Sequence, residues 1–269
     1  YWISACLSNV SFAILLFSAL GYFFHPFEGG NNLLSCICAS VFLWVLVLLV
    51  ARGVKEATGI NVVVTIAKLI PLALFVVSII LLGKFNPDIF FANFWGEPGG
   101  PDLSTQIIST MIALVWVFTG IEGAVVISGR AKYAKDVGRA TAIGFIAVFV
   151  LYFIISLESM GIMSRAEMAA LSTPSMAGIL ECAIGPIGAS IVNLGVVLSL
   201  LGAMLGYVII AAETPFEAAR QGVFPKSFAK TNKNGAPIVT VLISAAIVQL
   251  FLIVSVFSES TYQFFYACA

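Results

Sequence analysis

Charge and histidine are both scarce in this chain. Only 10% of its 269 residues are charged and 61% are hydrophobic, with the apolar residues in long runs. A soluble domain carries far more charge, so the composition predicts an all-α integral membrane protein. His25 is the single histidine. The sequence therefore does not contain the residues for a histidine metal centre or a Ser-His-Asp triad. It also contains no ATP-binding loop.

We expect no disulfide framework among the cysteines. They are odd in number, scattered, and mostly placed in apolar runs, where a thiol behaves as a small hydrophobic group. They are Cys6, Cys36, Cys38, Cys182 and Cys268. We expect no metal site and no cofactor.

Runs of about twenty apolar residues predict seven transmembrane spans and the start of an eighth near residue 260. The expected spans are residues 3–24, 32–51, 60–83, 104–128, 140–163, 187–212 and 236–257. The chain opens on Tyr1 inside an apolar run and closes as another run begins. We expect residues 1–269 to be a single transmembrane transporter domain, incomplete at both ends, with no signal peptide.

The basic residues gather in alternate loops, although the chain has 13 basic and 13 acidic residues. The loops after the second, fourth and sixth spans carry Arg52 and Lys55, then Arg130, Lys132, Lys135 and Arg139, then Arg220, Lys226, Lys230 and Lys233. The positive-inside rule makes these loops cytoplasmic. The pattern predicts a multi-pass protein of the cell (inner) membrane, in contact with the lipid bilayer and with no nucleic-acid partner.

Local signals define the loop after the sixth span. Thr214, Pro215 and Glu217 supply a capping residue, a proline for the first helical position and a glutamate for the third. Gly222 supplies a stop. We predict a separate short helix here that serves as a structural connector.

The fourth span is broken past its middle. Thr119, Gly120 and Gly123 surround a carboxylate, Glu122. An ionisable residue at membrane depth is costly unless it faces water or a partner, and irregular backbone survives there only where it lines a cavity. The break predicts that the chain moves something polar.

Three further positions are candidates for function. Trp116 offers an aromatic face that can hold a cation, with packing as the alternative. Lys68 lies about eight residues inside the third span, or about 12 Å at helical rise, which is near the limit of snorkelling. It can act as a fixed cation or a proton carrier. Asn9 needs amide partners in lipid, either a ligand or a neighbouring helix.

Three segments resemble the amino acid-polyamine-organocation transporters. Within that superfamily the resemblance is to the basic amino acid antiporters, and to bacterial arginine/ornithine exchangers in particular. The segments are residues 1–9 (YWISACLSN), 116–124 (WVFTGIEGA) and 213–225 (ETPFEAARQGVFP). The resemblance implies a LeuT-type fold of inverted repeats, of which this chain would cover about helices 3 to 9 and the start of helix 10.

The same resemblance implies roles for the broken span. It places Trp116 over the substrate side chain as a middle gate. It places the backbone of Thr119, Gly120 and Ile121 near the amino-acid group of the substrate. Glu122 becomes a proton-sensitive or gating carboxylate.

Other spans supply further implied site residues. Tyr1 matches a gating tyrosine, and Asn9 matches a substrate-contacting asparagine. The substrate-binding positions between them are Ser4 and Ala5. Lys68 matches a lysine that takes the place of a sodium ion in several relatives. Tyr207 stands where the arginine/agmatine relatives carry a second stacking tryptophan, which puts the strength of guanidinium stacking in doubt.

These observations lead to one functional prediction. The chain belongs to a transporter, not an enzyme, that exchanges basic amino acids by alternating access, as in arginine/ornithine antiport. Proton-coupled symport of lysine or another amino acid, and histidine/histamine exchange, are the alternatives. A channel would show repeated polar rings, and a membrane enzyme would show a nucleophile with a base or metal ligands. The sequence leaves formation of a homodimer open.

Overall fold

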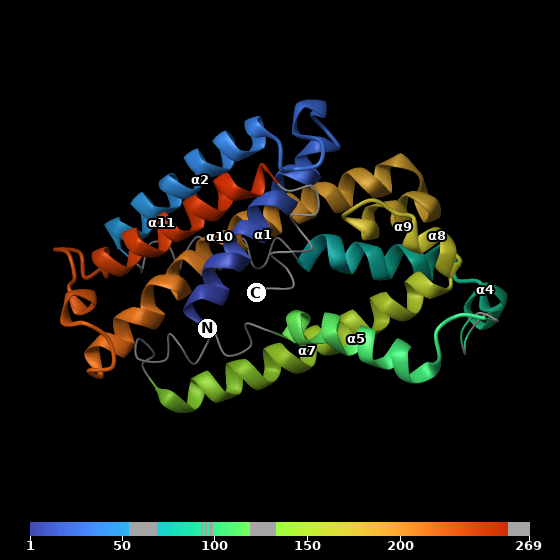
Figure 1. Cartoon of the computed structure of the whole chain (residues 1–269). Coiled ribbons are helices and arrows are strands. Elements are labelled where there is room, and N and C mark those ends of the chain that lie inside the picture. Colours follow the sequence, from blue (N-terminus) through green and yellow to red (C-terminus); the bar gives the residue numbers. More distant parts are fainter. Residues whose placement is uncertain (54–68, 93, 95, 97–98, 119–132, 258–269) are drawn as a thin grey trace. The chain divides into compact units, whose positions relative to one another are not determined.

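A computed structural model describes most of the chain (Figure 1). Residues 54–68, 93, 95, 97–98, 119–132 and 258–269 lie outside the description, as do the side chains of residues 112, 113, 116 and 134. The described residues form helices and connections, with no strand among them. The predicted all-α membrane architecture is confirmed.

The chain divides into two compact units. Unit 1 comprises Tyr1–Ile70 and Asn193–Ala269, and unit 2 comprises Pro71–Val192. The elements of unit 1 are α1 (Trp2–Gly21), η1 (His25–Phe27), α2 (Leu33–Arg52), most of α10 (Pro186–Arg220), η3 (Lys226–Ala229) and α11 (Ile238–Ser255). The elements of unit 2 include α4 (Pro87–Ala92), α5 (Leu103–Phe118), α7 (Ala134–Met160), α8 (Arg165–Ala169) and α9 (Ser175–Ile184). The prediction of one transporter domain stays a prediction.

Five described helices are long and apolar enough to cross a membrane. They are α1, α2, α7, α10 and α11, which confirms five of the predicted spans. The third and fourth spans are described in part, as an apolar helix at Leu69–Leu81 and as α5. The predicted start of an eighth span lies outside the described residues.

The fifth span begins earlier than predicted. Hydropathy placed its start at residue 140, whereas α7 begins at Ala134. The added turn contains Lys135, Asp136 and Arg139. Charged residues end a hydrophobic run, but lysine and arginine remain good helix formers, so the helix continues past the apolar segment.

The prediction of a separate helix after the sixth span is wrong. Helix α10 continues without a break to Arg220, with Pro215 inside it. The hydroxyl of Thr214 does not cap a new helix, because it donates to the carbonyl of Ile210 at 2.8 Å. The predicted stop is confirmed, since Gly222 follows the helix with φ +81°.

Helix α1 forms the centre of unit 1. Of its most apolar 18-residue window, 67% is buried, against 33% for α2 and 39% for α11. Its buried side chains pack with those of α2, α10 and α11 in one core. Small residues such as Ala5, Ala13 and Ala19 are almost fully buried on α1, which lets neighbouring helices approach closely.

Helices α2 and α11 lie side by side (Figure 1). Trp44 Nε1 donates to Gln249 Oε1 at 3.2 Å, and Gln249 Nε2 donates to Ser40 Oγ at 2.8 Å. One turn closer to the start of α2, Cys36 Sγ donates to the carbonyl of Leu252 at 3.4 Å. Hydrogen bonds of this kind hold helices together in lipid, where the hydrophobic effect between them is weak.

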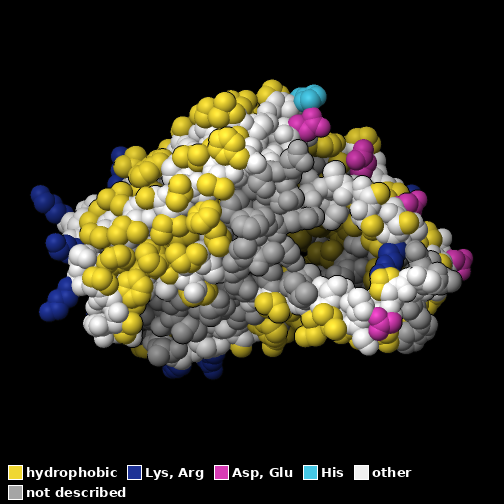
Figure 2. All heavy atoms as spheres, in the orientation of Figure 1, with side chains coloured by type: hydrophobic (Ala, Val, Ile, Leu, Met, Phe, Trp, Pro, Cys, Tyr) yellow, Lys and Arg dark blue, Asp and Glu magenta, His cyan; other side chains and the backbone are white. Residues whose placement is uncertain are grey.

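The loop between α10 and α11 folds over the C-terminal end of α2. Asn232 Nδ2 donates to the carbonyl of Ala51 at 2.7 Å, and Asn232 Oδ1 accepts from the backbone N–H groups of Asn234 at 2.9 Å and Ala236 at 3.0 Å. Figure 2 shows basic side chains gathered over this loop. Arg52 and the basic residues of the loop therefore share one end of unit 1, as the topology prediction requires.

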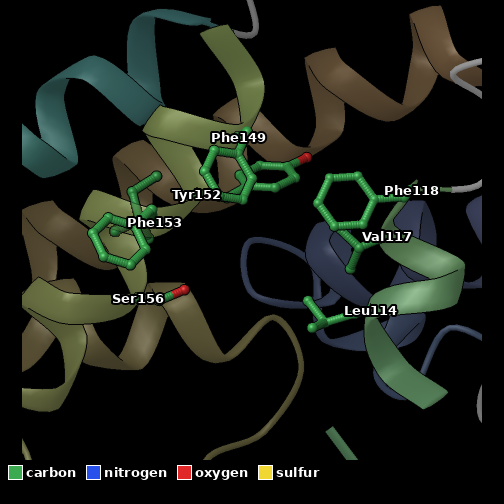
Figure 3. A pocket seen from close by; sticks show the side chains of 8 residues that line it. Leu114, Val117, Phe118, Phe149, Tyr152, Phe153 and Ser156 are labelled. Carbon is green, nitrogen blue, oxygen red and sulfur yellow. The ribbon is translucent and has the colours of Figure 1, made fainter. Parts of the chain in front are cut away.

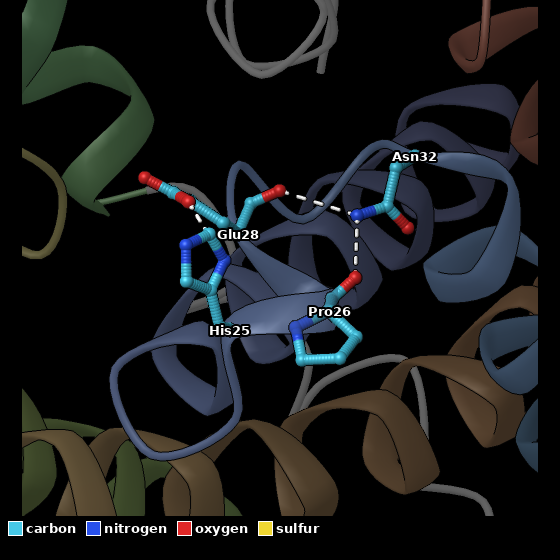
Figure 4. Close-up of polar contacts among 4 residues, drawn as sticks. All are labelled: His25, Pro26, Glu28 and Asn32. Carbon is cyan, nitrogen blue, oxygen red and sulfur yellow. Dashed lines mark hydrogen bonds and ion pairs between the residues drawn. The ribbon is translucent and has the colours of Figure 1, made fainter.

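A compact turn joins α1 to α2 at the opposite end (Figure 4). Asn32 caps α2, because its Oδ1 accepts from the N–H of Ser35 at 2.8 Å. The Nδ2 of Asn32 donates back to the carbonyls of Pro26 at 2.8 Å and Glu28 at 3.3 Å. His25 Nδ1 lies 3.1 Å from Glu28 Oε2, with both side chains largely exposed. The single histidine thus belongs to a surface turn.

Candidate substrate site

The first predicted site residues lie along one stripe of α1. Tyr1, Ala5 and Asn9 are four residues apart, so they share a helix face. Tyr1 is 44% exposed at the start of the helix, and Ser4 is half-buried. Ala5 and Asn9 are buried in the core of unit 1. The stripe therefore contains two buried residues, Ala5 and Asn9.

Asn9 is a fully buried amide. Its exposure is 0%, and neither Oδ1 nor Nδ2 has a hydrogen-bond partner in the part of the chain that the structure describes. Leaving a buried polar group unpaired costs about 1–3 kcal/mol. A ligand that accepts from Nδ2 and donates to Oδ1 would remove that cost. The prediction that this amide needs partners fits its burial, and its contact with a ligand stays a prediction.

Tyr207 of α10 lies against the same side of α1. Its ring makes an edge contact with Phe12, with centroids 5.0 Å apart and planes at 87°. Phe12 shares the helix face of Tyr1 and Asn9, since eleven residues correspond to about three turns. The contact of Tyr207 with Phe12 thus lies on the seam between α1 and α10, and Asn9 precedes Phe12 by about one turn on the same face of α1.

The broken span is described only up to its break. Trp116 lies in α5, and its side chain is outside the description. The four predicted positions that follow, and the lysine of the third span, also lie outside the described residues. They are Thr119, Gly120, Ile121, Glu122 and Lys68.

Two buried carboxylates were missed by the sequence analysis. Glu213 in α10 is 2% exposed and Glu158 near the end of α7 is 8% exposed. Glu158 Oε2 has no hydrogen-bond partner among the described residues. Each stands near the end of an apolar run, where the sequence does not distinguish a buried carboxylate from a loop residue. No three His, Cys, Asp or Glu side chains cluster within the described parts of the chain.

Unit 2 contains a cavity of about 530 Å³ between α5 and α7 (Figure 3). The lining residues are Leu114, Val117, Phe118, Phe149, Tyr152, Phe153, Ile155 and Ser156. On one wall the rings of Phe149 and Phe153 stack, with centroids 6.4 Å apart. Among the described residues, the lining carries no charged side chain.

These features define a multi-pass membrane protein with a buried amide that has no partner among the described residues and an aromatic ring at a helix seam. Comparison with known proteins gives the family. The amino acid permease family matches residues 1–269, and the chain belongs to it. The resemblance to the amino acid-polyamine-organocation superfamily and its LeuT-type fold is confirmed.

Several curated relatives are similar over nearly the whole chain. An arginine/ornithine antiporter of Pseudomonas aeruginosa is 46% identical over 262 residues, covering 96% of this chain and 54% of the relative. An arginine/ornithine antiporter of Latilactobacillus sakei is 38% identical and covers 99% and 57%. An arginine/agmatine antiporter of Chlamydia pneumoniae is 37% identical and covers 98% and 55%. The chain spans about half the length of the curated relatives it matches.

Proposed function

We propose that the full-length protein exchanges basic amino acids across the cell membrane by alternating access, with arginine and ornithine as the exchanged pair. The observation that carries the proposal is the similarity along the whole chain to three antiporters whose names all include arginine. Membership of the amino acid permease family supports a transporter, which requires no covalent chemistry. Exchange needs no energy source within the protein, because one solute gradient drives the other.

The seam between α1 and α10 is the described part of the proposed binding site. Asn9 offers a donor and an acceptor with no partner among the described residues, and a substrate's carboxylate and ammonium groups would use both. Tyr207 offers an aromatic face to a guanidinium or ammonium group. Tyr1 acts as the gating tyrosine, and Ser4 and Ala5 lie between it and Asn9 on α1.

The broken fourth span supplies the rest of the proposed site. Trp116 covers the substrate side chain as a gate, and the backbone of Thr119, Gly120 and Ile121 receives the amino-acid group. Glu122 acts as the gating carboxylate. Lys68 supplies a fixed positive charge in the third span. Support for these roles comes from the sequence and from family membership.

The orientation follows from the basic loops. Asn232 and Asn234 both donate to the carbonyl of Ala51, so the loop after α10 and the end of α2 meet at one end of unit 1. The positive-inside rule makes this end cytoplasmic. We place the protein in the inner membrane on that basis and leave its oligomeric state open.

Reconstitution of the full-length protein tests the proposal. Liposomes are loaded with ornithine or left empty, and uptake of labelled arginine is followed with and without an imposed pH gradient. Exchange predicts uptake only into the loaded liposomes, whatever the pH gradient. Uptake into empty liposomes driven by the pH gradient would replace antiport with proton symport. Competition by histidine and lysine would then rank the other substrates.

A further inference from the structure

Helix α10 contains a proline whose missing hydrogen bond is replaced from another helix. Pro215 has no N–H, so the carbonyl of Ala211, four residues earlier, loses its helical partner. Ser244 of α11 donates its hydroxyl to that carbonyl at 2.9 Å. Ala211 and Ser244 are both buried, so water does not compete for the bond. A hydroxyl on a neighbouring helix is a recognised way for a membrane helix to tolerate proline.

The same hydroxyl connects α10 to the start of α1. Trp2 Nε1 donates to Ser244 Oγ at 2.8 Å, so the hydroxyl accepts one hydrogen bond and donates another. A hydroxyl that accepts a hydrogen bond is polarised by it and donates a stronger one. The result is a relay from Trp2 through Ser244 to Ala211, which joins α1, α11 and α10 at one point.

Aromatic rings fix the indole of Trp2 in place. Phe224 and Phe228 meet it edge to face, with centroids 5.9 and 6.0 Å away, and the two phenyl rings lie 5.5 Å apart. Phe228 belongs to η3 and Phe224 follows the end of α10. The loop that continues from the proline-containing helix therefore packs back on the relay's first residue. Edge contacts of this type add specific orientation to apolar burial.

We propose that Ser244 and Trp2 are positioning residues of the transport cycle. Ser244 takes the place of the N–H that Pro215 lacks and so holds the final turns of α10. Trp2, next to Tyr1, ties the start of α1 to that point. The relay sets the rate of exchange by holding the start of α1 and the final turns of α10 together, without touching substrate. The transport part rests on the proposed function, whereas the structural part does not.

A double-mutant cycle on the full-length protein tests the structural part. Ser244→Ala leaves the carbonyl of Ala211 unpaired and is expected to lower the midpoint of thermal unfolding by about 2–4 °C. Pro215→Ala restores an N–H that can bond to the same carbonyl. In the Pro215→Ala background, Ser244→Ala loses only the bond from Trp2, so its effect on the midpoint should be about half as large. Equal effects of Ser244→Ala in the two backgrounds would overturn the proposal.

Trp2→Phe is the matched control for the cycle. It keeps an aromatic ring between Phe224 and Phe228 but removes the donor to Ser244. Its effect on thermal unfolding should differ between Pro215 and Pro215→Ala by less than that of Ser244→Ala, because Trp2→Phe leaves Ser244 able to donate to Ala211. A rescue of Trp2→Phe by Pro215→Ala as large as that of Ser244→Ala would show a general stabilisation of α10 and would count against the relay.

Exchange and binding measurements test the transport part. Ser244→Ala and Trp2→Phe should each lower arginine/ornithine exchange about fivefold, the rate equivalent of one hydrogen bond. The affinity for arginine should stay within about twofold, because neither residue contacts substrate. A loss of affinity equal to the loss of rate would overturn the positioning role. If the unsubstituted protein shows no exchange, the proposed function is wrong. The thermal-unfolding cycle still tests whether Ser244 replaces the hydrogen bond that Pro215 lacks.

Discussion

Asn232→Ala is expected to loosen the loop between α10 and α11 from the end of α2. The side chain of Asn232 donates to Ala51 O and accepts from the N–H groups of Asn234 and Ala236, at 2.7, 2.9 and 3.0 Å. The bond to Ala51 crosses 181 residues of sequence, so it closes a long connection. Alanine removes all three bonds and leaves the backbone bonds of the turn in place.

The magnitude follows from these three bonds. A neutral hydrogen bond contributes about 1 kcal/mol net, which gives about 3 kcal/mol for the set. Asn232 is half-buried, so water reaches part of the freed groups and returns some of that energy. We expect a loss of about 2 kcal/mol in the free energy of unfolding.

Asn234→Ala provides the matched control in the same turn. Its Nδ2 reaches the same carbonyl of Ala51, but at 3.4 Å and from an exposed side chain. Such a long bond contributes little, so the loss should stay below about 0.5 kcal/mol. Unfolding of the full-length protein is followed by circular dichroism in dodecyl maltoside micelles as the fraction of dodecyl sulfate rises. Equal losses for the two variants would refute the reasoning.

Other predictions concern the gate, a close contact and a cap. Trp116→Leu should abolish arginine/ornithine exchange without changing the circular dichroism spectrum, and near-normal exchange would remove the residue from the gate. Gly30→Ala should lower the free energy of unfolding by more than about 2 kcal/mol, because Gly30 has φ +73° and an added Cβ would lie 2.1 Å from the carbonyl oxygen of Ile14. An unchanged unfolding curve would contradict that contact. Hydrogen bonds from the side chain and backbone of Ser164 lower the pKa of Glu167 from its usual 4.5. Because the folded pKa is the lower one, the capping box around α8 is fully stabilising well above pH 4.5 and weakens as the pH falls below it. Hydrogen exchange of the α8 amides should show this change, and Glu167→Gln should remove it.

The hydrophobic runs predicted the spans. Signals from neighbouring residues gave a wrong prediction where a residue on another helix decides the structure. The predicted starts of α1 and α2 lie within one residue of the observed ones, because each begins where an apolar run begins. Thr214 and Pro215 have the pattern of a new helix start. They sit inside α10 because Ser244 supplies the bond that Pro215 cannot make. Nothing near the proline in sequence indicates a donor from α11.

The site was predictable in part for the same reason. Asn9 stands out as an amide in an apolar run, and its burial agrees with that interpretation. Ser244 and Trp2 also lie in or beside apolar runs, but serine and tryptophan are common there, so their types do not reveal the bond between them. Which polar group faces which partner depends on helix packing, and hydropathy does not contain that information.

The pairing of α2 with α11 has a consequence for synthesis of the protein. The hydrogen bonds of Gln249 join residues 205 and 209 positions apart, and that of Cys36 spans 216. At a synthesis rate of about 5–20 residues per second, α2 waits about 10–40 s in the membrane before its partner emerges. During that interval the indole of Trp44 lacks its acceptor on α11, and one side of α2 is open to lipid or to an insertion factor. The time needed to complete unit 1 is therefore set by the rate of translation, and not by the rate at which the helices pack.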